Sequence, residues 1–186
     1  MESRTEVHRE LARRRYESQV HGWKQGRIEI WYTPEGEIDE PYELTLFSPK
    51  RGDWTVPMTS RASMDSNPEF QMYWTRIPDF GIKEYTVWPN EEGWICRMTF
   101  AGTAEDGTPV TAHQVDIVTT DDRCRVVRME WYSDQLQWFT VFSVASGKPV
   151  EEVQALFRTT GGFKQLIAET LAERDARRAQ AGRTAD

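Results

Sequence analysis

The chain has 186 residues, of which 23 are Lys or Arg and 30 are Asp or Glu, so its formal net charge is −7. One domain of ordinary size accounts for this length, and the acidic balance argues against a surface that neutralises nucleic-acid phosphates. Aromatic residues are abundant, with 8 Trp, 6 Tyr and 8 Phe, although the mean hydropathy is low at −0.69. We therefore expect the aromatic side chains to fill either the core or a binding pocket.

The N-terminal segment predicts an amphipathic helix from Thr5 to Gln25. Its apolar residues recur at helical spacing on one face: Val7, Leu11, Tyr16, Val20 and Trp23. On the same helix, Arg13, Arg14 and Arg15 are expected to lie on the solvated surface. Residues 28–47 mix strand-like pieces with turn residues at 33–36, and the polar segment 48–67 is typical of a long loop.

The middle of the chain predicts a helix followed by a sheet. The helix is expected to begin at Asn67-Pro68, where Asn can cap and Pro fits the first helical position, and to end near Pro78. β-Branched and aromatic runs separated by short turns then indicate an antiparallel meander. The expected strands are residues 82–88, 94–103, 109–120 and 125–133.

The C-terminal part predicts two helices after Pro149, separated by Gly161-Gly162, with residues from about 172 onward expected to fray. We expect one domain at residues 1–145 and a helical extension at residues 146–186. The element order indicates an α+β fold in which a bent antiparallel sheet wraps over helices and leaves a cone-shaped cavity.

Several classes of function are disfavoured. No stretch reaches the roughly 20 apolar residues that a membrane span needs, and no signal segment is evident, so a soluble, cytoplasmic protein without membrane contact is expected. The two cysteines and three histidines show no ligand spacing, and there is no phosphate loop or Ser-His-Asp signature. We expect neither a metal nor another cofactor.

Asp116 is the residue whose surroundings point most clearly to chemistry. It lies among Val115, Ile117 and Val118, and a lone carboxyl group in such a run should have a raised pKa because burial disfavours its charge. Such a group can donate a hydrogen bond to a substrate oxygen or exchange a proton with it. Alternatively, Asp116 pairs with an arginine across the sheet. Arg97 and Arg128 are examples of arginines that could make this pairing.

Three stretches carry a resemblance to a known family: YWTRIPDF at 73–80, DIV at 116–118 and RVVRMEWYSD at 125–134. Together they resemble the nuclear transport factor 2-like superfamily, and within it the SnoaL-like polyketide cyclases and ketosteroid isomerases. The resemblance covers about residues 5–140. It implies an α+β barrel, in which a cone-shaped curved antiparallel sheet wraps around the N-terminal helices, and a homodimer.

The resemblance also implies roles for three catalytic candidates. Asp116 matches the carboxyl group that faces the cavity, Glu40 before Pro41 resembles the isomerases' general base, and Tyr16 resembles their oxyanion donor on the first helix. Two alternatives stay open. Glu40 lies in a generally acidic stretch that fits a solvated loop, and Tyr16 stands about one turn early and fits a buried structural tyrosine.

Candidate substrate-binding residues follow from strand alternation and from the resemblance. They are Trp23, Trp74, Gln114, Met129 and Trp131, with ordinary core packing as the alternative for the aromatic and methionine side chains. Limonene epoxide hydrolase-like relatives carry an Arg and a second Asp where this chain has Gln114 and Trp131. Epoxide hydrolysis by that mechanism is therefore disfavoured.

Two functions stay open at this point. The first is a cofactor-free enzyme that uses Asp116 for enolate-type cyclisation, isomerisation or dehydration of a small apolar cyclic or polyketide-like carbonyl compound. The second is a non-catalytic small-molecule-binding or dimerisation module. The binding module would have Asp116 satisfied by an arginine or by backbone groups, with no second titratable group facing it. Three or more polar groups that converge on a point about a hydrogen-bond length from Asp116 would favour the enzyme, whereas a single one would favour the binding module.

Overall fold

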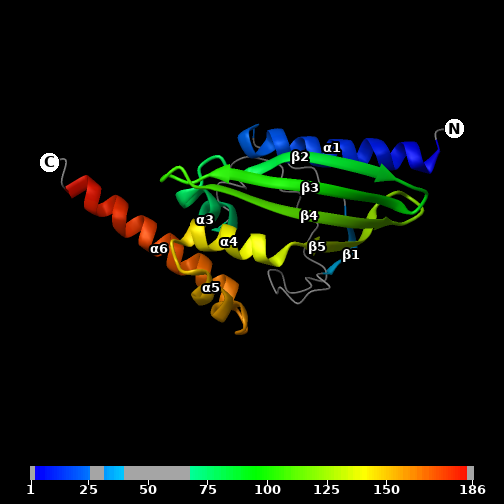
Figure 1. Ribbon diagram of the computed structural model, residues 1–186. Coiled ribbons are helices and arrows are strands. Elements are labelled where there is room, and N and C mark those ends of the chain that lie inside the picture. Colours follow the sequence, from blue (N-terminus) through cyan, green and yellow to red (C-terminus); the bar gives the residue numbers. More distant parts are fainter. Residues whose placement is uncertain (1–2, 26–31, 40–67, 184–186) are drawn as a thin grey trace.

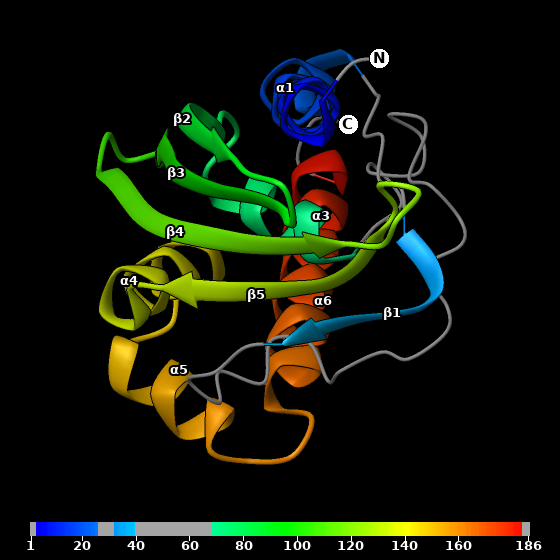
Figure 2. The same ribbon diagram turned by 90° about the vertical axis from the view of Figure 1, so that its right-hand side faces the viewer.

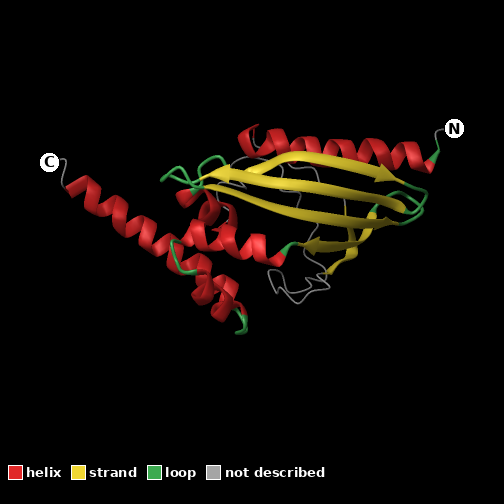
Figure 3. Cartoon of the chain, in the orientation of Figure 1, coloured by secondary structure: helices red, strands yellow, loops and turns green. Residues whose placement is uncertain are grey.

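The computed structural model describes residues 3–25, 32–39 and 68–183, and of residues 18–19, 21–25 and 32–39 it describes the backbone only. Figures 1 and 3 show the elements along the chain. In chain order they are α1 (Arg4–Gln25), β1 (Tyr32–Asp39), α3 (Pro68–Arg76), β2 (Gly81–Pro89), β3 (Gly93–Thr103), β4 (Pro109–Thr120), β5 (Val126–Ser133), α4 (Gln135–Ser146), α5 (Val150–Phe157) and α6 (Gly162–Arg183).

The strands form one five-stranded sheet in the order β1-β5-β4-β3-β2, which is antiparallel except for the β1–β5 pair. Figure 2 shows the sheet curving, with α1 close to β2, α4 and α5 on the far side of the strands, and α3 and α6 behind them. The predicted α+β class with a curved antiparallel sheet is confirmed. Over the described strands the sheet is open, with β1 and β2 at its two edges.

The meander from β2 to β5 matches the four predicted strands to within a residue at nearly every end. Its turns follow the chemistry that the sequence indicated. The Asn90 side-chain oxygen accepts hydrogen bonds from the backbone N–H groups of Glu92 and Gly93, at 2.8 and 3.0 Å, which closes the β2–β3 turn. Gly107 takes a φ of 86° in the next turn, where a side chain would be strained.

Strand β1 corrects the prediction of a turn at residues 33–36. The structure places these residues inside a strand that pairs in parallel with β5, although the register shifts between Tyr32 and Glu37. Pro34 and Gly36 lie within that irregular stretch. Because β1 is an edge strand, a proline without an N–H group is tolerated there. The strand-like pieces predicted on either side, and the loop at 48–67, lie outside the described residues.

The C-terminal helices pack on α3 and on one end of the sheet. Helix α4 begins at Asp134, whose side chain accepts a hydrogen bond from the Gln137 backbone N–H group at 3.0 Å. Arg76 of α3 pairs with Glu173 of α6 at 2.8 Å. The prediction that the chain frays from about residue 172 is wrong, because α6 continues to Arg183. Its Ala, Arg, Glu and Gln residues favour a helix even where they are exposed.

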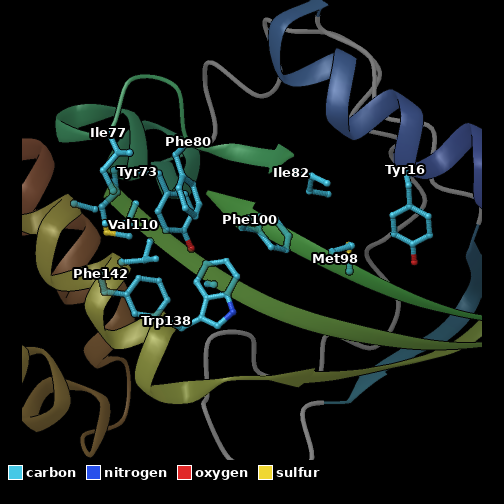
Figure 4. Packing of buried hydrophobic residues seen from close by; sticks show 14 of the residues in the cluster. Tyr16, Tyr73, Ile77, Phe80, Ile82, Met98, Phe100, Val110, Trp138 and Phe142 are labelled. Carbon is cyan, nitrogen blue, oxygen red and sulfur yellow. The ribbon is translucent and has the colours of Figure 1, made fainter. Parts of the chain in front are cut away.

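Aromatic rings dominate the core where α3 and α4 meet the sheet (Figure 4). We call this cluster the aromatic end, and it comprises Tyr73, Phe80, Phe100, Trp138 and Phe142. Ring centroids within it lie 5.0 to 6.2 Å apart. Trp138 and Phe142 are therefore core residues, although they stand next to the predicted boundary at residue 145. The division into a domain and an extension stays a prediction.

Whether a helix of the fold could cross a membrane depends on its length and its apolar character. Within residues 3–25, 32–39 and 68–183, none of the helices combines the length and the apolar character that spanning a membrane requires. The expected cytoplasmic location stays a prediction.

Candidate active site

Asp116 lies in the middle of β4 with its carboxyl group 1% exposed. As predicted from strand alternation, Gln114 and Val118 share its face of the sheet, which is the buried face. The register places Cys96 of β3 directly opposite Asp116 on one side, and Trp131 of β5 opposite it on the other. The carboxyl group is thus enclosed by its neighbours within the sheet on both sides.

Two neutral side chains hold the carboxyl group of Asp116. The Tyr16 hydroxyl lies 3.0 Å from Oδ2, and the Gln114 amide Nε2 donates to Oδ1 at 2.8 Å. Tyr16 itself accepts a hydrogen bond from the Trp94 indole Nε1 at 3.2 Å. Tyr16 thus contacts Asp116 although it stands about one turn early in the sequence, and it is also fully buried, as the structural alternative held.

Arg15 is the third polar group at this position, and here the expectation of a solvated side chain is corrected. Its side chain is buried, and Nη2 lies 4.0 Å from Asp116 Oδ2 and 3.3 Å from the sulfur of Met129. Arg13 and Arg14, by contrast, are exposed and pair with Glu10. Asp116 thus has an arginine beside it, as the alternative held, but this arginine is Arg15 of α1 and comes from a helix, not from across the sheet.

Burial and charge act in opposite directions on Asp116. Removal from water raises the pKa of its carboxyl group, whereas Arg15, Gln114 and Tyr16 all act to lower it, and burial has the larger effect. The pKa of Tyr16 is raised well above its ordinary value by burial and then by the Asp116 charge. Tyr16 therefore keeps its proton throughout the physiological range and acts as a hydrogen-bond donor.

The predicted binding residues fall into three groups. Met129 and Trp131 lie beside Asp116 with Gln114, through the β4–β5 register and the contact of Met129 with Arg15. Trp74 is not part of this cluster, because it donates to the Phe80 carbonyl at the aromatic end. The remaining candidates, Glu40 and the side chain of Trp23, lie outside what the structure describes.

Sequence reasoning missed Arg15 and Trp94. The buried face of α1 carries His8, Ala12, Arg15 and Tyr16. His8 and Arg15 are thus buried, although neither belongs to the apolar stripe that the periodicity indicated. Trp94 could have been found from alternation alone, because it stands two residues before Cys96 on the buried face of β3. Trp88 of β2 is 49% exposed and lies outside this cluster.

Comparison with known proteins gives similar solved structures but no sequence relatives. No protein-family model matches the chain, and no curated protein does. A protein from Jannaschia sp. CCS1, named with the SnoaL-like polyketide cyclases, is 13% identical with a TM-score of 0.48, over 80% of this chain and 98% of its own. An NTF2-like protein from Burkholderia thailandensis is 12% identical with a TM-score of 0.47, over 76% of this chain and 98% of its own.

A third match, from Catenulispora acidiphila, has a ketosteroid isomerase-like fold. It is 9% identical with a TM-score of 0.44, over 73% of this chain and 93% of its own. The resemblance noted in the sequence is confirmed by the names of the structures that this chain matches, which are SnoaL-like, NTF2-like and ketosteroid isomerase-like. A shared fold at such low identity does not determine the activity.

Proposed function

We propose that the protein is a cofactor-free enzyme in which Asp116 is the general base for enolate-type chemistry on a small, largely apolar cyclic or polyketide-like carbonyl compound. The observation that carries this proposal is the convergence of three polar groups on one buried carboxyl group. Tyr16 and Gln114 hydrogen-bond this carboxyl group, and Arg15 brings a positive charge within 4.0 Å of it. An arginine beside Asp116 also fits the binding module, and the exchange experiment below separates the two functions.

The direction of the hydrogen bonds supports a base rather than an acid. Gln114 donates its amide N–H to Asp116, Arg15 brings a permanent positive charge, and Tyr16 has a proton to give. All three stabilise the ionised carboxylate. Burial at the same time raises the pKa of Asp116, which makes the ionised carboxylate a stronger base than an exposed aspartate.

The proposed step transfers one proton. A substrate carbon next to the carbonyl group loses its proton to Asp116, the C–H bond breaks and an O–H bond forms, and the electron pair moves to the carbonyl oxygen. Once Asp116 is neutral, the Tyr16 hydroxyl no longer faces an anion and can donate to the enolate oxygen instead. Return of the proton to another carbon isomerises the substrate, and attack by the enolate on a second carbonyl group cyclises it.

Arg15 keeps the charge of the site balanced during this step. Buried charges are stable only when they are paired, and Asp116 neutralises Arg15 in the resting site. When Asp116 takes a proton, the negative charge passes to the substrate oxygen and stays close to the same guanidinium group. The net charge of the site is therefore unchanged, which favours a neutral substrate that becomes anionic only during the reaction.

The proposal is tested by solvent deuterium exchange. Purified protein is incubated in D₂O with 1-tetralone or 2-tetralone, and loss of the α-proton signal is followed by ¹H NMR. We expect the wild type to accelerate exchange and Asp116→Asn to lose about 100-fold or more of that acceleration. Asp106→Asn, at an exposed turn position, is the matched control. Equal rates for wild type and Asp116→Asn would refute the base, and binding without exchange would instead identify the non-catalytic module.

A homodimer that forms through the outer face of the sheet is a further part of the proposal. In support, Trp88 is 49% exposed on the edge strand β2 and stands opposite Ile95 on that face. Sedimentation equilibrium should give twice the chain mass for the wild type and a larger monomer fraction for Trp88→Glu. A wild-type monomer at micromolar concentration would contradict it.

A further inference from the structure

Trp94 joins the candidate active site through a hydrogen bond that can run in one direction only. Its indole nitrogen lies 3.2 Å from the Tyr16 oxygen, and that oxygen lies 3.0 Å from Asp116 Oδ2. All three side chains are buried, with 2%, 0% and 1% exposure. An indole N–H group donates and never accepts, so the Tyr16 oxygen must be the acceptor in this pair.

The bond from Trp94 has a consequence for the proton of Tyr16. With one lone pair of its oxygen engaged by Trp94, Tyr16 still has its single O–H group, and among the described residues it meets the Asp116 carboxylate, a strong acceptor, and the Cys96 sulfur, a weak one. If Asp116 donated to Tyr16 instead, the tyrosine proton would be left buried without a strong acceptor, at a cost of about 1–3 kcal/mol. The arrangement Trp94 to Tyr16 to Asp116 satisfies every group when Asp116 is ionised.

Trp94 is held rigidly enough to impose this direction. It stands opposite Val118 in the β3–β4 register, and its ring lies 6.2 Å from that of His8. His8 is itself fixed between two turns, with Nδ1 2.7 Å from the Asn90 carbonyl oxygen and Nε2 2.7 Å from the Thr120 hydroxyl. A buried indole between these neighbours has little freedom to rotate away from Tyr16.

We propose that Trp94 is a positioning residue, which acts through Tyr16 to direct the tyrosine proton onto Asp116 and so holds this carboxyl group in its ionised, base-ready form. The catalytic meaning of this inference rests on the proposed function. The geometry itself can be tested without any substrate.

The test is a double-mutant cycle read out on Asp116 itself. The full chain is labelled with ¹³C at the aspartate carboxyl carbon, the Asp116 signal is assigned by its absence in Asp116→Asn, and its pKa is measured by NMR titration. Wild type, Trp94→Phe, Tyr16→Phe and the double variant are compared. We expect Trp94→Phe to raise the Asp116 pKa, Tyr16→Phe to raise it further, and the double variant to match Tyr16→Phe alone.

Trp138→Phe is the matched control, because it removes the N–H group of another buried tryptophan at the aromatic end. It should leave the Asp116 pKa unchanged. The proposal is overturned if Trp94→Phe leaves that pKa unchanged, or if it shifts the pKa equally in the presence and in the absence of the Tyr16 hydroxyl.

A second measurement needs no substitution at Trp94. The chemical shift of the Trp94 indole ¹H–¹⁵N signal should change with the titration of Asp116 in the wild type, and this dependence should be lost in Tyr16→Phe. A Trp94 signal whose shift does not change during the titration would refute the coupling. Failure of the deuterium-exchange assay with this coupling intact would refute the proposed function and leave the positioning role standing.

Discussion

The buried face of the sheet carries a hydrogen-bonded polar cluster around Asp116 next to α1. Where α3 and α4 pack on the same face, aromatic rings gather instead (Figure 4). At the polar end, Tyr16, Trp94 and Arg15 surround the carboxyl group of Asp116. At the aromatic end, Phe142 lies 5.2 to 6.0 Å, centroid to centroid, from four other rings. The same strands, β3 and β4, run through both ends.

The two ends differ in what they contribute: the aromatic end stabilises the fold, and the polar end holds the groups of the proposed chemistry. Apolar burial at the aromatic end stabilises the fold without needing any partner of defined geometry. A buried carboxyl group and a buried guanidinium group cost free energy unless each is paired, so the polar end must be ordered by hydrogen bonds instead. We expect substitutions at the aromatic end to change stability most and at every pH, and those at the polar end to change stability less and in a way that depends on pH.

The largest effect is expected from Phe142→Ala, which opens a cavity among the aromatic rings. A loss of about 3–5 kcal/mol in the free energy of unfolding is expected, measured by urea denaturation. Leu136→Ala on the same helix α4 is the control, because Leu136 is 67% exposed and its removal should change stability by about 0.5 kcal/mol or less. Similar losses for the two variants would contradict the assignment of the core.

Tyr16→Phe should come next in size. It removes the donor to Asp116 and the acceptor for Trp94, and we expect a loss of about 1–3 kcal/mol in the free energy of unfolding. The loss should be larger at pH values where Asp116 is ionised, because a carboxylate needs the donor more than a neutral carboxyl group does. Urea unfolding of both proteins at several pH values checks this, and a loss independent of pH would speak against the Tyr16–Asp116 bond.

Arg15→Met and Arg13→Met compare a buried and an exposed arginine on the same helix, α1. Because the Arg15 charge lowers the pKa of the Asp116 carboxyl group, its removal should raise that pKa further. The exposed Arg13, which pairs with Glu10 and Glu17, should have no such effect. The NMR titration of Asp116 distinguishes the two, and equal shifts would mean that the burial of Arg15 has no electrostatic consequence.

The smallest effect on folding is expected from Asp116→Asn, because relief of the buried carboxyl group opposes the cost of removing a negative charge beside the buried Arg15. Burial raises the pKa of Asp116 above its unfolded value, so its contribution to stability is present below the unfolded pKa and is lost as the pH rises through the folded pKa. The asparagine variant lacks that loss. The difference in unfolding free energy between variant and wild type should therefore move in favour of the variant as pH rises, and a trend in the opposite direction would refute the raised pKa.

Local patterns predicted the sheet well and the face of α1 poorly. The four strands of the meander have strong β propensity and clear turns, so their bounds and the burial of Asp116 could be deduced from alternation. The face that α1 presents to the sheet could not, because Arg13, Arg14 and Arg15 are identical in type and adjacent. Only the rotation of the helix, anchored where His8 binds Asn90 and Thr120, decides that Arg15 is the buried one.

The sequence by itself determined the α+β class, the strand order of the meander and a buried carboxyl group at Asp116, because these depend on spacing along the chain. The tertiary structure alone decided which groups meet that carboxyl group. Tyr16 stands 100 residues from Asp116 and Trp94 stands 78 residues from Tyr16, so no local pattern relates them. Their contact depends on how one helix is seated on a curved sheet, and that seating is fixed by packing across the whole fold.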